Sequence, residues 1–409
     1  MNSPHRVVGP ALFAGVFAVA LQSQAIRRPT PTPTPQPQPQ GAPHMVVTET
    51  EVIGVTRDRA TAVVRVRNTR DRNVLPQYRR VDVRSGRVLS EWTLPARDGL
   101  EASVFFGRTQ PRDVGTHASA PAHQADVARY YDAISNVATS NELRFAAGQD
   151  RAVFNIGDDL WMSERNGREA RKISNTVAAY GPTISPDRQR VAFTGMVGRL
   201  DGVVGNYVLH VMDLRGRSSP IRVSSTRDVW YEDLAWSADS RFVYARMGAE
   251  HPEGGCFVRV MIQPPFAVER LACVDQSERI DFVAYSPSNT FAVVHGYRVH
   301  PSGGAQHSLQ WVDMNTGRVT VTARYVGVLN TGGVNDRGQL VTQTAAQRAL
   351  LWDPQARTLR ESAESVPVPI VFHDAAWIDE GRYVVGSNGT VRVIELGQQR
   401  WVDRGWPGI

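Results

Sequence analysis

Lysine and cysteine are nearly absent from this chain of 409 residues. Lys172 is the one lysine among 46 basic residues, and the others are arginines that stand singly along the chain. A phosphate-binding surface needs a clustered positive patch or stripe, so we expect no nucleic-acid binding despite the formal charge of +6. Two cysteines are too few for a small domain held together by many disulfides.

Recognisable catalytic motifs are missing as well. The sequence contains no Gly-x-Ser-x-Gly nucleophile elbow, no His-Glu-x-x-His pair, no P-loop and no Gly-x-Gly-x-x-Gly fingerprint. The ten histidines are scattered, and we expect the closest pair, His295 and His300, to be loop residues at the end of a strand. We therefore predict no catalytic residue, no metal ion and no cofactor.

The N-terminus has the features of an export signal. An apolar run over residues 7–21 is shorter than the ~20 residues of a membrane-spanning helix, and Ser23-Gln24-Ala25 suits signal peptidase cleavage. Residues 1–25 are therefore predicted to be a signal peptide of a periplasmic or secreted protein. The alternative is an uncleaved inner-membrane anchor at residues 7–21. Alternating prolines then predict an extended linker over residues 26–45.

The two cysteines flank a predicted hairpin. Cys256 and Cys273 stand at equal distances from the pair Pro264-Pro265, with an apolar strand pattern on each side of the prolines. If the strands pair about this turn, the cysteines face each other at ~4.5–5.5 Å between Cα atoms, close enough for a disulfide. We predict that bridge, and a pair of free buried thiols is the alternative.

A repeated pattern indicates the architecture. It consists of an aromatic or apolar residue, a turn containing Ser and Asp, and an alternating strand, as in Trp236-Ser-Ala-Asp-Ser-Arg-Phe-Val-Tyr244. The turns fall at Asp58, Asp150, Asp187, Asp239, Ser288, Asp336 and Asp379. Between the turns lie Gly-containing hairpin signals such as Val81-Asp-Val-Arg-Ser-Gly-Arg87. Two hairpins in about 40–50 residues are typical of one propeller blade.

The fold expected is therefore an all-β propeller over residues 46–405. Seven turns predict seven four-stranded blades. Residues 119–140 lack strand alternation, and their apolar residues recur every three or four positions, which predicts a short helical insertion between the first two blades. Six blades preceded by a small N-terminal domain are the alternative.

The turn pattern resembles the TolB-type, WD-repeat-like (PD40-type) propellers of bacterial periplasmic proteins. That family has Trp-Ser-Pro-Asp-Gly at this turn, whereas Arg59, Arg188 and Ser240 take the glycine position here. The resemblance covers roughly residues 50–400 and implies a propeller fold. It also implies a channel mouth that receives an extended peptide of a partner.

Candidate binding residues follow from aligning the repeats on the turn serine. The residue five positions before it enters the innermost strand near one mouth of the predicted channel. The acidic and aromatic residues at or beside this position are Tyr180, Trp230, Tyr231, Glu232, Asp233, Asp281, His373 and Asp374. Such a rim on a basic protein suits a cationic peptide segment or a metal ion, and the resemblance favours the peptide. The alternative is that these side chains only solvate a water-filled channel.

Two functions stay open. The first is an exported, non-catalytic scaffold that binds a protein or an extended peptide in the cell envelope as a monomer. The second is a glycoside or lactone hydrolase that uses carboxylates such as Glu232, Asp233, Asp281 and Asp374. Membrane contact is expected only through an N-terminal anchor. Ion pairs that occupy the rim carboxylates would weigh against the hydrolase, because its acid and base must be free around a cleft.

Overall fold

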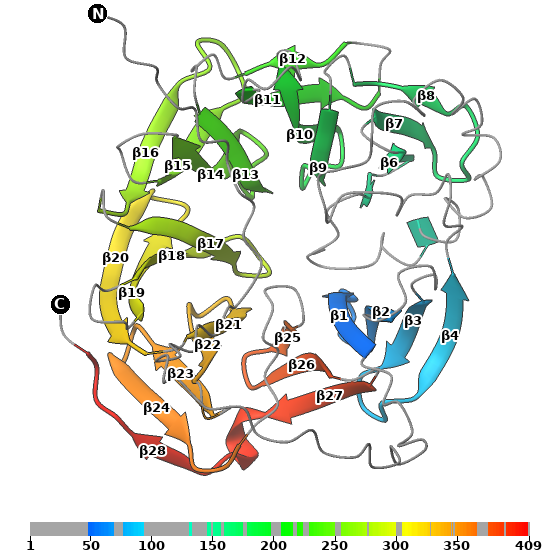
Figure 1. Ribbon diagram of the computed structural model, residues 1–409. Coiled ribbons are helices and arrows are strands. Elements are labelled where there is room, and N and C mark those ends of the chain that lie inside the picture. Colours follow the sequence, from blue (N-terminus) through cyan, green and yellow to red (C-terminus); the bar gives the residue numbers. More distant parts are fainter. Residues whose placement is uncertain are drawn as a thin grey trace, which may run out of the picture.

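The computed structural model describes most of the chain beyond residue 47. The residues described are 48–68, 77–93, 131–132, 145–148, 150–156, 159–174, 178–197, 206–215, 219–223, 229–249, 255–275, 278–299, 305–327, 329–344, 346, 348–365, 375–387 and 390–407. They form seven antiparallel sheets arranged in a ring (Figure 1). The chain is a seven-bladed β-propeller, as the spacing of the turns predicts.

The first four blades follow the chain in order. Blade 1 contains β1 (Thr48–Val55), β2 (Thr61–Asn68), β3 (Gln77–Asp82) and β4 (Val88–Thr93). Blade 2 contains β5 (Phe145–Ala147), β6 (Arg151–Ile156), β7 (Asp159–Glu164) and β8 (Arg171–Lys172). Blade 3 contains β9 (Ala178–Ile184), β10 (Arg190–Val197), β11 (Asn206–Asp213) and β12 (Ile221–Arg222). Blade 4 contains β13 (Val229–Trp236), β14 (Phe242–Ala249), β15 (Cys256–Met261) and β16 (Val268–Cys273).

The last three blades close the ring. Blade 5 contains β17 (Arg279–Tyr285), β18 (Phe291–Val299), β19 (Ala305–Asp313) and β20 (Arg318–Val326). Blade 6 contains β21 (Asn330–Val334), β22 (Leu340–Gln343), β23 (Ala349–Asp353), β24 (Thr358–Ser362) and β28 (Trp401–Asp403). Blade 7 contains β25 (Ala375–Asp379), β26 (Arg382–Ser387) and β27 (Thr390–Glu395), followed by the short 3-10 helix η3 (Leu396–Gln398).

The strand count of blades 6 and 7 differs from the predicted four per blade. The C-terminal strand β28 pairs with β24 through Ser362 and Trp401, so it extends blade 6 to five strands. Beyond β28, Trp406 packs against Trp311 of blade 5 and Trp352 of blade 6, with ring centroids 5.5 and 5.8 Å away. A strand of three residues carries no alternation, so the sequence pattern could not reveal this pairing.

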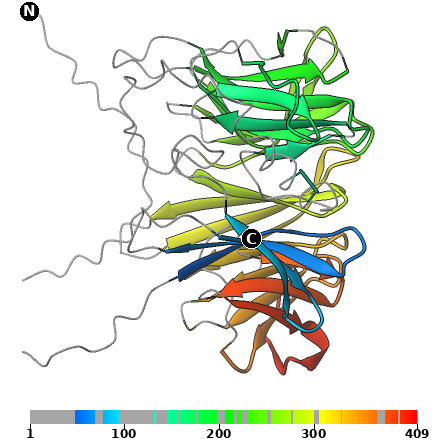
Figure 2. The same ribbon diagram turned by 90° about the vertical axis from the view of Figure 1, so that its right-hand side faces the viewer.

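Burial explains why the middle strands are apolar on both faces. Each blade packs against its neighbours through both faces, so all four residues of β22 and the middle of β18 are buried, whereas the outer strand β20 is mostly exposed. The seam between blades 3 and 4 buries Leu209, Tyr231 and Trp236 in one apolar cluster. Figure 2 shows the ring from the side, with the strands crossing its thickness. Stability is therefore shared by neighbouring blades, and a single blade has no complete core.

The Ser–Asp turns have one geometry in several blades. The turn hydroxyl donates to the aspartate two residues later, at 2.6 Å from Ser237 to Asp239 and 2.7 Å from Thr56 to Asp58. The next residue has a left-handed backbone, with φ of 60° at both Arg59 and Ser240. Glycine adopts this conformation most easily, which explains the family's Trp-Ser-Pro-Asp-Gly turn. Here the hydrogen-bonded turn holds non-glycine residues in it.

The hairpin in blade 4 confirms the predicted disulfide. Cys256 and Cys273 are direct partners in the β15–β16 ladder, with Cα atoms 4.1 Å apart, and their sulfurs are bonded. The bridge ties the third strand of the blade to its outermost strand.

The predictions for the N-terminus fall outside the residues that the structure describes. They concern the signal peptide (1–25), its alternative as an anchor (7–21) and the linker (26–45). Within the predicted insertion at 119–140 the structure describes Tyr131 and Asp132, whose backbone is helical. Among the described residues, no helix has the length and apolar character needed to span a membrane.

Candidate functional site

One position of the innermost strand recurs in blades 1, 3, 4 and 5. Glu51, Tyr180 and Glu232 pair in register with Arg65, Thr194 and Arg246 on the second strand of their blades. Asp281 stands at the equivalent place in blade 5, where its side chain faces His295 of β18. Each second-strand partner follows its inner-strand residue by fourteen positions. Because β1, β9, β13 and β17 lie nearest the centre of the ring, this position surrounds the centre (Figure 1).

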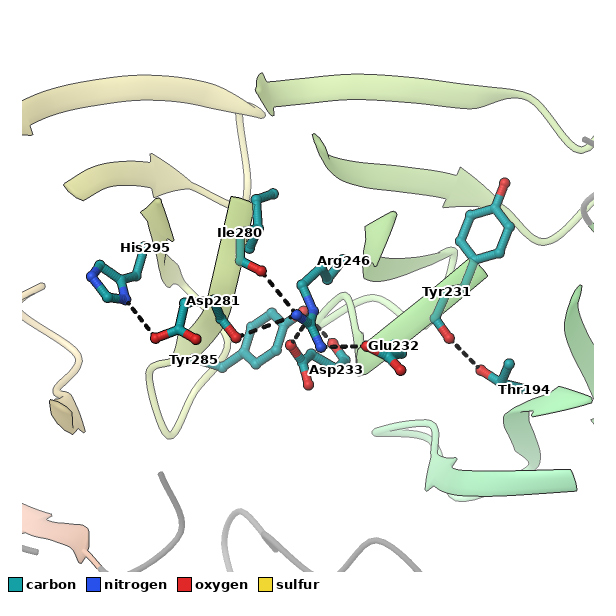
Figure 3. Close-up of polar contacts among 9 residues, drawn as sticks. All are labelled: Thr194, Tyr231, Glu232, Asp233, Arg246, Ile280, Asp281, Tyr285 and His295. Carbon is teal, nitrogen blue, oxygen red and sulfur yellow. Dashed lines mark hydrogen bonds and ion pairs between the residues drawn. The ribbon is translucent and has the colours of Figure 1, made fainter. Parts of the chain in front are cut away.

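In blade 4, one arginine holds two carboxylates. The Arg246 guanidinium pairs with Glu232 through Nη2 and lies 2.9 Å from Oδ2 of Asp233 through Nε (Figure 3). Its Nη1 also donates to the backbone carbonyl oxygens of Ile280, at 3.0 Å, and Asp281, at 3.3 Å. Arg246 therefore fastens the inner strand of blade 4 to the inner strand of blade 5.

Asp233 owes its position to an irregularity in β13. The ladder between β13 and β14 shifts register between Glu232 and Ala235, and Asp233 has a left-handed backbone with φ of 52°. This bulge places two consecutive carboxylates beside Arg246, although successive residues of a regular strand point to opposite faces. The Tyr285 hydroxyl of blade 5 donates to the Asp233 carbonyl at 2.5 Å and stabilises the bulge.

Burial raises the pKa of Glu232 and of Tyr285 at this seam, and neighbouring charges oppose or add to that increase. Burial raises the pKa of Glu232, although the charge of Arg246 offsets part of the increase. Burial also raises the pKa of Tyr285 well above its usual range, with a contribution from Asp233. The tyrosine therefore keeps its proton and remains a hydrogen-bond donor.

Blade 5 replaces the arginine with histidine. Oδ2 of Asp281 lies 3.4 Å from Nδ1 of His295, and the exposed fractions of the two side chains are 48% and 0%. Nε2 of His295 lies 2.7 Å from Nδ1 of His307 on β19, and Nε2 of His307 lies 2.8 Å from the Gly327 carbonyl. A continuous polar chain thus runs from the inner strand to the end of the outermost strand.

The charges along this chain favour an ionised Asp281. Burial raises the pKa of Asp281, but the hydrogen bond and charge of His295 and the charge of Arg246 outweigh it, so the pKa is held below its ordinary value. For His307, burial and the neighbouring charge of His295 lower the pKa from 6.5 to about 4. His307 is therefore neutral near pH 7.

The structure brings together part of the predicted rim. Glu232, Asp233 and Asp281 meet at the seam of β13 and β17. Tyr231 is fully buried in the core, and its carbonyl accepts a hydrogen bond from Thr194 at 2.9 Å, so its ring lies away from the rim. Tyr180 and Trp230 lie on β9 and β13, and the structure describes their backbone alone. His373 and Asp374 lie outside the described residues.

Sequence reasoning missed several residues of the site. It overlooked Glu51 because Thr56 replaces the turn serine in blade 1, and it overlooked Arg65 and Arg246 because the arginines are scattered. The spacing of fourteen residues from acid to base was the signal that could have revealed them. The sequence suggested that His295 is a loop residue, but the structure shows a buried residue of β18.

Known structures with similar folds include propellers of several kinds. An oligogalacturonate lyase in complex with manganese resembles this chain with a TM-score of 0.52 and 10% identity, over 88% of this chain and 91% of that chain. At that identity the likeness supports the propeller fold alone. A protein from Agrobacterium tumefaciens assigned as TolB has a TM-score of 0.40 and 14% identity, over 68% of this chain and 81% of that chain.

A puromycin hydrolase has a TM-score of 0.48 and 15% identity, over 88% of this chain, which spans about half, 52%, of the length of that chain. No family model matches the chain, and no curated protein matches it in sequence. The comparisons therefore establish neither a family nor an activity.

The seam is suited to holding a positive charge. Glu232, Asp233 and Asp281 are 34%, 29% and 48% exposed, so each can be reached from solvent. Arg246 pairs with Glu232 and Asp233, and the Asp281 carboxylate faces His295. In the part of the chain that the structure describes, no three His, Cys, Asp or Glu side chains are grouped to hold a metal ion.

Proposed function

We propose that this protein is an exported, non-catalytic propeller that binds a cationic, extended segment of a protein partner at the seam of blades 4 and 5. The observation that carries the proposal is the excess of acidic groups there, where three partly exposed carboxylates face one arginine and one buried histidine. An approaching Arg or Lys side chain would find charge-assisted hydrogen-bond acceptors in a chain that is basic overall. The disulfide in blade 4 supports export, because such bonds persist in oxidising compartments.

Two further considerations support a binding role. Arg246 already engages Glu232 and Asp233, which restrains these carboxylates and makes them poor candidates for a mobile acid and base. The resemblance of the turns to TolB-type propellers implies that a partner's extended peptide enters at one mouth of the ring.

The proposal is tested by affinity capture from envelope extract. The wild-type chain is compared with the double variant Glu232→Ala/Asp281→Ala, and bound proteins are identified by mass spectrometry. The control is Glu91→Ala/Glu269→Ala, which removes two carboxylates that also pair with arginines but lie on the outer strands β4 and β16. We expect specific partners that the rim variant loses and the control retains. Equal recovery by all three proteins would contradict the proposed site.

A hydrolase is the second candidate. It is favoured by one observation, the buried His295 behind the half-exposed Asp281, because a carboxylate backed by imidazole can exchange a proton with a bound substrate. Turnover of a panel of glycosides and lactones that disappears in Asp281→Asn would support this alternative. Absence of turnover by the wild-type protein would remove it.

A further inference from the structure

In the polar chain of blade 5, the carbonyl of Gly327 at the outer end determines which nitrogen donates in each hydrogen bond. The Gly327 carbonyl can only accept a hydrogen bond, so Nε2 of His307, at 2.8 Å, must carry a proton and donate it. Because His307 is neutral, its Nδ1 is then an acceptor. The contact of 2.7 Å therefore requires that Nε2 of His295 is the donor.

This order of donors and acceptors leaves open whether Nδ1 of His295, at the inner end of the chain, carries a proton. With Nε2 of His295 protonated, a neutral His295 would turn the lone pair of Nδ1 toward the Asp281 carboxylate, 3.4 Å away. Two acceptors facing each other repel, and Nδ1 has no other hydrogen-bond partner. The repulsion disappears when one additional proton lies between Asp281 and His295. An imidazole is in general a stronger base than a carboxylate, so the geometry assigns the proton to Nδ1 of His295.

The surrounding groups favour this placement. Arg246 of β14 supplies a positive charge near Asp281 that keeps the carboxylate ionised. His307 of β19 stays neutral, and Tyr297 and Tyr325 contact His307 through their rings. Glu278, buried at the start of the blade, accepts a hydrogen bond from Ser308 at 2.7 Å. The fully buried imidazolium of His295 thus has one direct counter-ion, Asp281.

We propose that Asp281, His295 and His307 form a proton-linked binding site for a guanidinium or ammonium group, in which the incoming cation replaces the proton of His295. This inference rests on the proposed function and adds its regulation. In the empty site, the imidazolium neutralises Asp281. When the cation binds Asp281, Nδ1 of His295 releases its proton to water, and the charge of the site is unchanged.

Affinity for a cation should therefore rise with pH. While Nδ1 of His295 carries a proton, that proton competes with the cation for Asp281, so each unit of pH decrease weakens binding up to tenfold. Once that proton is absent, the affinity becomes constant. Arg246 cannot take part in such exchange because guanidinium does not lose its proton in proteins. Blade 5 is thus the part of the rim in which a base exchanges its proton for the bound cation.

The first test locates the proton without any ligand. Nuclear magnetic resonance of the chain labelled with ¹⁵N-histidine reports the protonation of each ring nitrogen between pH 5 and 9, and His295→Gln and His307→Gln assign the signals. We expect His295 to be doubly protonated at pH 6 and His307 to be the neutral Nε2–H tautomer. A neutral His295 at pH 6, or the opposite tautomer of His307, overturns the inference.

The second test uses a fluorescent hexa-arginine peptide and measures binding from pH 5.5 to 8.5. We expect the wild-type affinity to rise by up to tenfold per pH unit at the acidic end of this range, and binding by His295→Gln to be independent of pH. Asp281→Asn should bind weakly at every pH. If His295→Gln does not fold, the nuclear magnetic resonance signal of His295 in the wild-type chain is used instead. Added peptide must then favour the deprotonated form of His295 at a given pH.

The outcomes separate the two proposals. Binding of the peptide without pH dependence overturns the proton linkage and leaves the binding function intact. No binding of the peptide at any pH overturns the cation site. If affinity capture then still recovers a partner that needs Glu232 and Asp281, the binding function stands without this inference.

Discussion

Blades 4 and 5 place an acid at the same register of the innermost strand and give it different partners. Glu232 faces Arg246, whose guanidinium keeps its charge, whereas Asp281 faces the imidazole of His295, which is fully buried. The arginine reaches across the seam to the carbonyls of Ile280 and Asp281. The histidine instead connects outward to His307. The comparison shows that one repeated position joins two blades through an arginine in blade 4 and begins a chain of buried histidines in blade 5.

The outer strands of the two blades differ as well. Blade 4 joins its third and fourth strands by the Cys256–Cys273 disulfide. Blade 5 has no cysteine, and the ends of β19 and β20 are connected through His307 and the Gly327 carbonyl. Blade 4 thus depends on a covalent bond and a permanent ion pair, whereas blade 5 depends on hydrogen bonds that change with protonation.

Removing the disulfide should have the largest effect on blade 4. Replacing both cysteines, Cys256→Ala/Cys273→Ala, frees a loop with a sequence separation of 17 residues. A loop of that size is expected to contribute about 3 kcal/mol by restricting the unfolded chain. Thermal unfolding followed by circular dichroism should show a lower midpoint. The wild-type protein with and without a reducing agent is the control, and equal midpoints would contradict the prediction.

Breaking the permanent ion pair should have the next largest effect. Arg246→Ala leaves Glu232 and Asp233 without their counter-ion and removes the bonds to blade 5. We expect a loss of about 2–3 kcal/mol, below the full cost of breaking a buried pair because the group is partly exposed. Chemical denaturation measures this loss in the free energy of unfolding. Arg215→Ala, which removes a solvent-exposed pair with Asp213, is the control and should cost less than about 1 kcal/mol.

The third prediction concerns the pH dependence of blade 5. The pKa of His307 falls from 6.5 to about 4 on folding, so the unfolded chain binds a proton in that window and the folded chain does not. The contribution of His307 to stability is therefore present above pH 6.5 and is lost as the pH falls toward 4, with a slope of up to about 1.4 kcal/mol per pH unit.

This dependence is measured as the difference between wild type and His307→Gln in unfolding at pH 4 to 7. Glutamine retains a donor for the Gly327 carbonyl and does not titrate. We expect the wild-type protein to lose more stability than the variant as the pH falls. Parallel profiles would contradict the assignment of His307 as a buried neutral group.

The smallest effect is expected at the bond between the two blades. Tyr285→Phe removes the hydroxyl that donates to the Asp233 carbonyl and should cost about 1 kcal/mol. Tyr297→Phe, which removes the hydroxyl of a ring that contacts His307, is the comparison within the same blade. No loss of stability in Tyr285→Phe would show that the Tyr285 hydroxyl does not support the bulge of Asp233.

The fold could be predicted from the sequence because its signal repeats. The Ser–Asp turns at Asp187 and Asp239 recur with hairpin signals between them, so each copy supports the others even where the glycine is replaced. The disulfide followed from the symmetry of Cys256 and Cys273 about one turn. The pairing of β28 with β24 could not be foreseen, since it joins distant segments and involves three residues.

The site was predicted only in part, for a physical reason. Alignment on the turn serine located Glu232 and Asp281, because the inner-strand position is set by local spacing. Their partners Arg246 and His295 lie on the next strand, and choosing them requires the register of pairing. The bulge at Asp233 and the contact between His295 and His307 depend on the three-dimensional arrangement of the strands.

The return of β28 to blade 6 has a consequence for blade 7. Ser362 and Trp401 are ladder partners, so the chain between them, which contains all of blade 7, is a loop closed at both ends on the same blade. Closing a loop reduces the number of conformations that its unfolded form can adopt. While β24 and β28 stay paired, this closure limits the conformations that blade 7 can adopt when it unfolds by itself, so the last strand opposes local unfolding of blade 7.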